Sequence, residues 1–248
     1  MPGMKWTFMS LQILDEVRSG KMTFAEMFPR ARAAGFVAYD ASDMDAEFAD
    51  REEVLRLCRE NGLKIADYIH WIHMATPDDK ALEAAIESGK QAVHTALAHG
   101  TKMLMIVEQV NRHDLEKLTR QEASRRMGCA LREIVNYADK FGVTVMVEDF
   151  PVPALPMSTS DEMKALLDAA PGLQLILDTG NMLAQKEDPL HFYQALKGHY
   201  AHVHLKDIEY PENATTGDID CDGRHIWNAQ HGEGVVNFAA LLPDLKQD

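Results

Sequence analysis

The sequence predicts a parallel α/β barrel, the (β/α)8 architecture of the TIM barrel, in which the eighth strand has no counterpart at the C-terminus. Three observations predict this fold. Short segments rich in β-forming residues alternate with longer segments of helical periodicity. A glycine precedes most of the β-rich segments, where a helix must end and the chain must turn. The length of 248 residues is close to the roughly 250 residues of a single barrel, so we expect one domain over residues 1–248.

Seven β-rich segments are the candidate strands, and three segments between them have clear helical spacing of apolar residues. The expected strands are residues 5–11, 37–42, 64–72, 102–110, 143–150, 173–178 and 201–208, and the expected helices include 47–60, 78–98 and 120–140. Strands separated by helices pair in parallel through right-handed crossovers, so this order indicates one parallel sheet. A doubly wound open sheet is the alternative, but the first strand is not followed by the glycine-rich GxGxxG turn of that fold.

A closed barrel needs eight strands, and the sequence offers seven. The last segment, LLPDLKQD, has the pattern of the helix that follows the seventh strand. We therefore expect either a chain that is cut short or an arrangement that covers the edges of the first and seventh strands, because bare strand edges promote aggregation.

Composition and charge argue against several classes of protein. The 25 Lys+Arg against 39 Asp+Glu give a formal net charge of −14, which disfavours nucleic acids and anionic membranes as partners. Cys58, Cys129 and Cys221 are widely spaced and odd in number, which argues against a disulfide scaffold or a structural zinc site. The first residues lack the apolar core of a signal peptide, and no stretch is apolar for long enough to cross a membrane. We expect a cytoplasmic protein.

Polar residues at the ends of three neighbouring strands are the first candidates for a functional site. In VTVMVEDFP, the alternation directs Val145 and Val147 toward the helices and Glu148 toward the barrel interior. The same reasoning turns Asp178 inward in LQLILDTGN and His204 inward in AHVHLKDI. Because the C-terminal ends of barrel strands carry the reacting groups, we expect these three side chains on one rim.

Two carboxylates and one imidazole make a partial shell for one divalent metal ion, Mn²⁺, Mg²⁺, Co²⁺ or Zn²⁺. Each residue also has an ordinary structural interpretation, since a strand-end carboxylate often caps a helix or stays at the surface. The coincidence of Glu148, Asp178 and His204 on successive strands favours the metal site. His202, deeper on the same strand as His204, is expected to be a hydrogen-bonded core residue.

The long segment 209–237 is expected to form a lid or a substrate loop over the rim. Within it, Arg224 is a candidate to bind a phosphate or carboxylate group, and His231 is a candidate to contact the substrate. His70, near the end of the third strand, is a further candidate to line the pocket. A solvated arginine and a packed histidine are the alternative interpretations.

Four motifs, VEDFP, LDTGN, HVHLKD and GEGVVNF, resemble in order and separation those of the xylose isomerase-like barrels, a superfamily that includes sugar-phosphate isomerases and epimerases. The resemblance covers nearly the whole chain. It implies that Glu148, Asp178 and His204 bind the metal together with a glutamate on strand eight, which has no counterpart here. Glu233 precedes the last helix and does not replace that glutamate by position. Many relatives carry a histidine where this sequence has Asn181, which implies a contact with substrate there and not a proton transfer.

The resemblance implies a divalent-metal-dependent isomerase or epimerase that acts on a sugar or related hydroxy-ketone through an enediolate. Glu148 is then the first candidate to move the proton, with Lys206 or a pocket histidine as a helper. The same scaffold suits a dehydratase of a keto-inositol or dehydroshikimate-like substrate, and a non-catalytic metabolite-binding protein is an alternative of another class. A DNA-repair endonuclease is disfavoured by the acidic charge. Relatives are often dimers or tetramers, which implies self-association as one arrangement of this chain.

Overall fold

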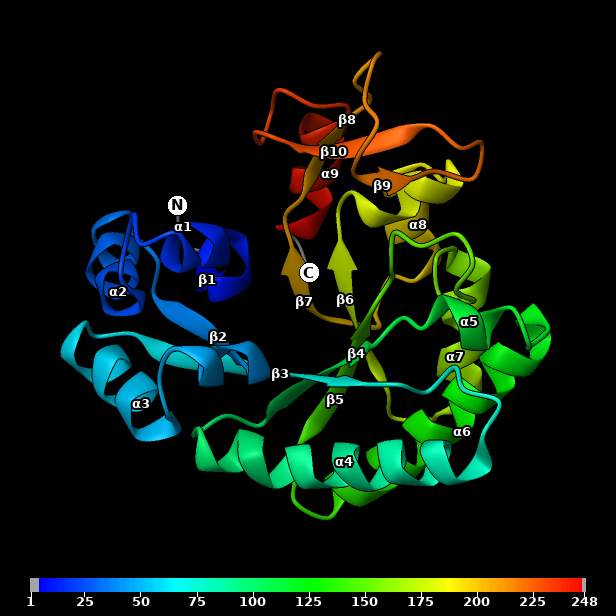
Figure 1. Cartoon of the computed structure of the whole chain (residues 1–248), viewed down its shortest axis with the longest axis horizontal. Coiled ribbons are helices and arrows are strands. Elements are labelled where there is room, and N and C mark those ends of the chain that lie inside the picture. The colour runs from blue at the N-terminus through cyan, green and yellow to red at the C-terminus, as the bar shows by residue number, and fades with distance from the viewer. Residues whose placement is uncertain (1–4, 247–248) are drawn as a thin grey trace.

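The computed structural model describes residues 5–246 and is built on a seven-stranded parallel sheet whose strands follow one another in chain order. The sheet curls into an open barrel with helices around its outer face (Figure 1). This confirms the predicted barrel that lacks one strand. The strands are β1 (Thr7–Met9), β2 (Ala38–Ser42), β3 (Lys64–Ile72), β4 (Met103–Glu108), β5 (Thr144–Glu148), β6 (Gln174–Asp178) and β7 (Tyr200–His204).

Helices of different length connect the strands, and the two longest, α4 and α6, cover β3, β4 and β5. The helices are α1 (Leu14–Arg18), α2 (Phe24–Ala33), α3 (Arg51–Glu60), α4 (Asp79–Ala98), α5 (Arg112–Leu115), α6 (Arg120–Asp139), α7 (Ser160–Ala169), α8 (Pro189–Ala195) and α9 (Phe238–Leu245). Among residues 5–246, no helix combines the length and the apolar character needed to cross a membrane.

Two apolar layers flank the sheet, because successive residues of a strand face opposite sides. Val145 and Val147 belong to the large core between the sheet and the helices, together with residues of α4, α6 and α7. Met146 and Ile176 point to the other side, where they form a small apolar cluster with residues of β3 and β4. The predicted alternation therefore holds. Glu148, two residues after Met146 on the same strand, lies on the inner face as well.

The longest helices pack closely because one position has no side chain. At Gly89 of α4, a Cβ atom would lie only 2.4 Å from Cδ1 of Ile134 on α6, so a larger residue would push the two helices apart. Thr119 caps the start of α6 by accepting a hydrogen bond from the backbone N–H of Glu122 at 3.1 Å. The close contact at Gly89 and the cap at Thr119 hold α4 and α6 in place behind the strands that carry the site.

The barrel remains open between β1 and β7, since the ladder described for residues 5–246 ends at these two strands. The predicted first strand, residues 5–11, is shorter than expected because the chain enters a 3-10 helix at Ser10. The predicted seventh strand, residues 201–208, is divided into β7 and β8 (Asp207–Glu209). The division has a local cause: Thr179 Oγ1 donates to the carbonyl of Lys206 at 2.7 Å and accepts from its N–H at 2.8 Å, so a side chain replaces the strand ladder.

A small antiparallel sheet stands where the sequence predicts a lid or loop. It consists of β8, β10 (His225–Ala229) and β9 (Asp218–Ile219) in that order, and it lies above the C-terminal ends of β6 and β7 (Figure 1). Asp207 anchors it by accepting hydrogen bonds from the backbone N–H groups of Gly232, Gly234 and Val236 at 2.8 to 3.0 Å. The segment is therefore ordered by main-chain pairing and by one buried carboxylate.

Candidate metal and substrate site

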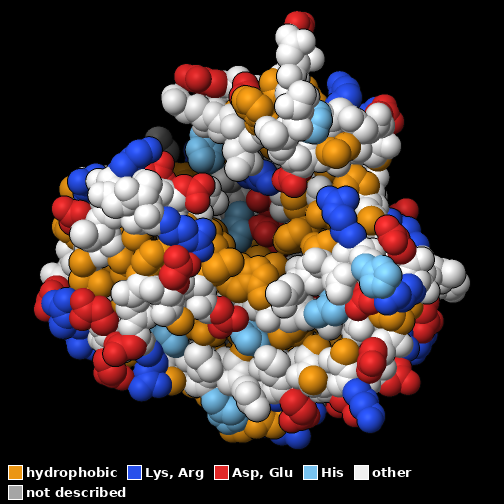
Figure 2. Space-filling model, in the orientation of Figure 1, with side chains coloured by type: hydrophobic (Ala, Val, Ile, Leu, Met, Phe, Trp, Pro, Cys, Tyr) orange, Lys and Arg blue, Asp and Glu red, His pale blue; other side chains and the backbone are white. Residues whose placement is uncertain are grey.

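A cavity of about 1260 Å³ opens at the C-terminal ends of the strands and extends into the barrel. Figure 2 shows it as a hollow below the small sheet, with acidic and histidine side chains at its base. Its wall is largely apolar, and Trp71, Met105 and Phe150 are part of it. Such a cavity can exclude water from a bound molecule while a few polar groups orient it.

Three of the polar groups come from adjacent strands and meet in this cavity. Glu148 ends β5, Asp178 ends β6 and His204 ends β7, and the register places Asp178 opposite His204. One donor atom from each side chain lies within 4.8 Å of the others, and both carboxylates are buried. The structure thus brings together the three residues that the sequence analysis singled out as metal ligands.

The three side chains carry more negative than positive charge, because two carboxylates meet one imidazole. Nδ1 of His204 contacts Oε1 of Glu148. Burial alone would lower the pKa of His204, but the charge of Glu148 and the hydrogen bond to it raise this pKa to about 10. Burial and the charge of Glu148 raise the pKa of Asp178 to about 6. The cluster therefore attracts positive charge, and a divalent cation bound by the carboxylates and a neutral imidazole would displace the proton of His204.

The turn after β6 orients Asp178. Its Oδ1 accepts hydrogen bonds from the backbone N–H groups of Gly180 at 2.7 Å and Asn181 at 2.9 Å. The Asn181 amide in turn donates to the backbone carbonyl of Asp149 at 2.7 Å. The DTGN segment is thus a hydrogen-bonded turn that orients Asp178 and places a second polar side chain, Asn181, at the cavity.

Lys206 and His231 also line the cavity. The ammonium group of Lys206 donates to Oδ1 of Asn181 at 2.8 Å and lies close enough to Asp178 to stabilise its charged form. Nε2 of His231 lies 2.9 Å from the carbonyl oxygen of Leu205. The ammonium group of Lys206 is therefore held beside Asn181 and Asp178 at the cavity, whereas His231 is held at the rim by the backbone.

Two of the sequence candidates lie away from the cavity wall. His70 is engaged by Asp43 at 2.6 Å and by Ser88 at 2.9 Å. Arg224 lies over the ring of Tyr210, 4.2 Å from its centroid, and its Nε donates to Asp220 at 3.0 Å. Both side chains hold parts of the fold together in this structure.

Two carboxylates inside the barrel were not predicted from the sequence. Asp40 of β2 and Asp67 of β3 are 1% and 2% exposed, so they lie among the most deeply buried charges of the protein. A signal for both was available, because an aspartate in the middle of a predicted strand is out of place in an apolar core. His202 was judged a hydrogen-bonded core residue, but its Nε2 is buried without a hydrogen-bond partner in the described residues.

The sequence matches the model of the xylose isomerase-like TIM barrel family over residues 14–248. Among curated proteins, it is 26% identical over 231 residues to L-ribulose-5-phosphate 3-epimerase UlaE of Escherichia coli (strain SE11), an alignment that spans 88% of this chain and 77% of that protein.

Solved structures show the same fold. The IolI protein with a bound zinc atom superposes with a TM-score of 0.76 at 17% identity, over 98% of this chain and 85% of IolI. The probable 3-DHS dehydratase AsbF of Bacillus anthracis superposes with a TM-score of 0.74 at 19% identity, over 98% of this chain and 89% of AsbF. At these identities the likeness concerns the fold alone.

Proposed function

Because this chain belongs to the xylose isomerase-like TIM barrel family, we propose that it is a divalent-metal-dependent isomerase or epimerase of a sugar or related hydroxy-ketone. One observation carries the proposal: Glu148, Asp178 and His204 meet with donor atoms within 4.8 Å in a cavity large enough for a sugar. The name of the related UlaE epimerase and the zinc atom of IolI support the same interpretation. Mn²⁺, Mg²⁺, Co²⁺ and Zn²⁺ are the candidate metals, of which Mn²⁺ and Mg²⁺ suit the two carboxylates best.

The bound cation would supply Lewis-acid polarisation of a substrate carbonyl and its neighbouring hydroxyl. Since Oε1 of Glu148 contacts His204, Oε2 is the atom assigned to take the proton from the carbon beside the carbonyl. The electron pair of the broken C–H bond moves toward the carbonyl oxygen, and the substrate becomes an enediolate. Return of the proton to the neighbouring carbon, with transfer of the hydroxyl proton of that intermediate to the former carbonyl oxygen, gives isomerisation. Epimerisation needs a second proton donor on the opposite face of the same carbon, and Lys206 is the candidate for that donor.

Lys206 and Asn181 serve the same step without moving the proton from carbon. Their mutual hydrogen bond fixes the ammonium group at the cavity wall, where it can donate to the oxygen that gains negative charge. Asn181 keeps one orientation because its amide also donates to the backbone. This arrangement favours a planar, oxygen-rich intermediate over the neutral substrate.

A deuterium-exchange experiment tests the proposal. The metal-free protein is supplied with Mn²⁺ or Mg²⁺ and incubated in deuterated water with ketoses, ketose phosphates and keto-inositols, and proton NMR follows exchange at the carbon beside the carbonyl. We expect exchange in a ketose with the wild type and with Glu52→Gln, a change at an exposed glutamate of α3, and none with Glu148→Gln. Binding of metal and sugar without exchange would instead identify a metabolite-binding protein.

The dehydratase AsbF gives a second candidate reaction on the same fold. Loss of a β-hydroxyl after the proton is removed would yield an unsaturated product and water, which the same NMR spectra distinguish from an isomer. Dehydration of a keto-inositol or dehydroshikimate without exchange in any ketose would favour this lyase activity.

A further inference from the structure

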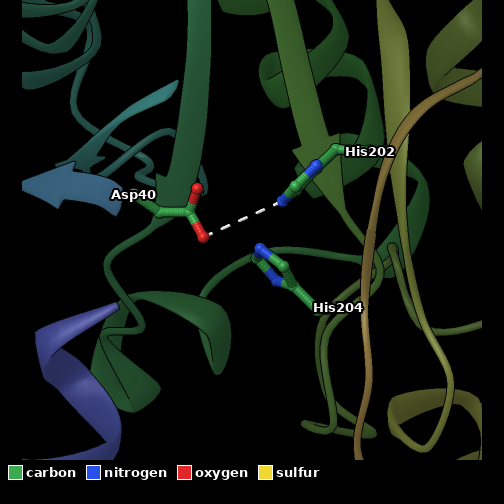
Figure 3. A group of neighbouring side chains, drawn as sticks. All are labelled: Asp40, His202 and His204. Atoms are coloured by element: carbon green, nitrogen blue, oxygen red, sulfur yellow. Dashed lines mark ion pairs between the residues drawn. The ribbon is translucent and has the colours of Figure 1, made fainter. Parts of the chain in front are cut away.

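A second group of metal-ligating side chains lies deeper in the barrel, on β2 and β7. Oδ2 of Asp40 lies 3.9 Å from Nε2 of His202, and both side chains point toward the ring of His204 (Figure 3). One donor atom from each of the three lies within 4.8 Å of the others. Asp40, His202 and His204 all line the cavity, so an ion can reach them from the solvent.

The two imidazole donor atoms of this group have no hydrogen-bond partners. In the part of the chain that the structure describes, Nε2 of His202 and Nε2 of His204 are buried and unpaired, and so is Oδ1 of Asp40, the oxygen that does not face His202. Buried polar atoms are nearly always paired, so two unpaired imidazole nitrogens beside a buried carboxylate indicate a missing ligand. The 3.9 Å separation is too long for a hydrogen bond, but it is below the roughly 4.2 Å that two donors can span when each lies about 2.1 Å from one cation.

The local charge also favours a cation. Asp67 of β3 is 2% exposed, neither of its oxygens has a hydrogen-bond partner among residues 5–246, and it interacts electrostatically with Asp40, His202 and His204. Two buried carboxylates therefore face two imidazoles, in addition to the two carboxylates of the site described above. Buried charges of one sign are retained when an ion or a partner balances them.

We propose that Asp40, His202 and Nε2 of His204 form a second cation site, separate from the site of Glu148 and Asp178. Two imidazoles and one carboxylate are a donor set of zinc and iron enzymes, so a borderline ion, Zn²⁺ first, fits better than Mg²⁺. His204 belongs to both sites, because Nδ1 contacts Glu148 and Nε2 faces Asp40. When both sites are filled, the ring must lose the protons of both nitrogens and bridge the two ions as an imidazolate. Occupation of one site therefore changes the affinity of the other.

The proposed ion would also connect two parts of the sheet that no main-chain hydrogen bonds join. β2 and β7 lie on opposite sides of the opening that follows β7, and no main-chain ladder joins β7 to β1 in residues 5–246. A cation bound by Asp40 and by two residues of β7 would connect these two sides. Thr7 of β1 supports the arrangement, because its Oγ1 donates to Oδ2 of Asp40 at 2.7 Å.

Metal stoichiometry tests the proposal without any assay of turnover. The full chain is freed of metal, dialysed to equilibrium against Zn²⁺, and analysed by plasma mass spectrometry. We expect two Zn²⁺ per wild-type chain, and one for Asp40→Asn, for His202→Gln and for Asp178→Asn. The matched control is His191→Gln, a change at a histidine of α8 whose side chain is 70% exposed, and it should retain two. If the wild type binds one Zn²⁺ and His202→Gln keeps it, the second site does not exist.

A Co²⁺ titration separates this site from the one proposed for catalysis. The visible absorption of bound Co²⁺ should rise in two phases with the wild type, and each phase should be lost in a different variant, one in His202→Gln and the other in Asp178→Asn. Circular dichroism of the metal-free variants confirms that they are folded. A titration of one phase that Asp178→Asn abolishes and His202→Gln leaves unchanged would overturn the second site and leave the first intact.

Discussion

The two sides of the barrel differ in how firmly they are built. The closed side, β3 to β6 with α4, α6 and α7, has paired strands on both edges and side chains such as Leu131 that are fully buried. The open side consists of β1, β2 and β7 with the small sheet. β2 is buried, but β1 is only three residues long, β7 is partly exposed, and Trp6 before β1 is 45% exposed.

The site spans this boundary. Glu148 and Asp178 come from the closed side, whereas Asp40, His202 and His204 come from the open side. β5 and β6 are more deeply buried than β7, which carries the two histidines. Under the proposed function, catalytic geometry would therefore depend on the closed side, and a bound ion would order the open one.

The largest expected effect is on the rate of deuterium exchange, which should fall more for a change on the closed side than for one on the open side. Glu148→Gln should lower the rate of deuterium exchange by about 10³-fold or more, close to 4 kcal/mol of barrier, because it removes both the base and a ligand. Lys206→Met should lower it by about 10- to 100-fold, since it removes one hydrogen bond to the developing charge. Equal losses in the two variants would show that the closed side does not dominate the chemistry.

A truncated side chain on the closed side should also reduce the free energy of unfolding more than one on the open side. Leu131→Ala on α6 empties a fully buried position and should reduce the free energy of unfolding by about 3 kcal/mol. Leu245→Ala on α9, at a half-buried position of the open side, should reduce it by about 1 kcal/mol. Urea denaturation of the metal-free proteins measures both, and a larger loss for Leu245→Ala would contradict the comparison.

The anchor of the small sheet should be sensitive to one methyl group. A Cβ atom at Gly234 would lie 2.3 Å from Oδ1 of Asp207 and 2.4 Å from the carbonyl oxygen of Ile208. Gly234→Ala should therefore break hydrogen bonds to Asp207 and raise amide exchange in residues 207–236 by about tenfold, a cost of about 1.4 kcal/mol. Val235→Ala, at a 51% exposed neighbour, is the control and should leave exchange unchanged.

The smallest expected effect is a pH dependence confined to the open side. Burial would raise the pKa of Asp207, but the backbone N–H groups of Val236, Gly232 and Gly234 donate to it and hold this pKa below its usual value. Its contribution is complete above the unfolded pKa of about 3.9 and is lost as the pH falls through the lower folded pKa. NMR signals of these amides should shift in that acidic range, and they should not titrate with Asp207→Asn.

Local patterns were enough to predict the fold and to place the three rim ligands on successive strands. Alternation directs Glu148 and Asp178 inward, and parallel pairing brings their strand ends together. The contact between Asp40 and His202 was not predictable in this way, because β2 and β7 meet only through the curvature of the whole sheet. The role of Asp207 was hidden as well, since its partners lie 25 to 29 residues away along the chain.

The opening beside β1 also determines what length of molecule the cavity can accommodate. The cavity does not end at the inner face of the sheet: it continues past Phe8 to Arg30 and Ala34 around α2, and to Leu245 of α9. Under the proposed function, a ligand bound at Glu148 that is longer than the barrel interior would extend in this direction, between β1 and β7 and toward α2.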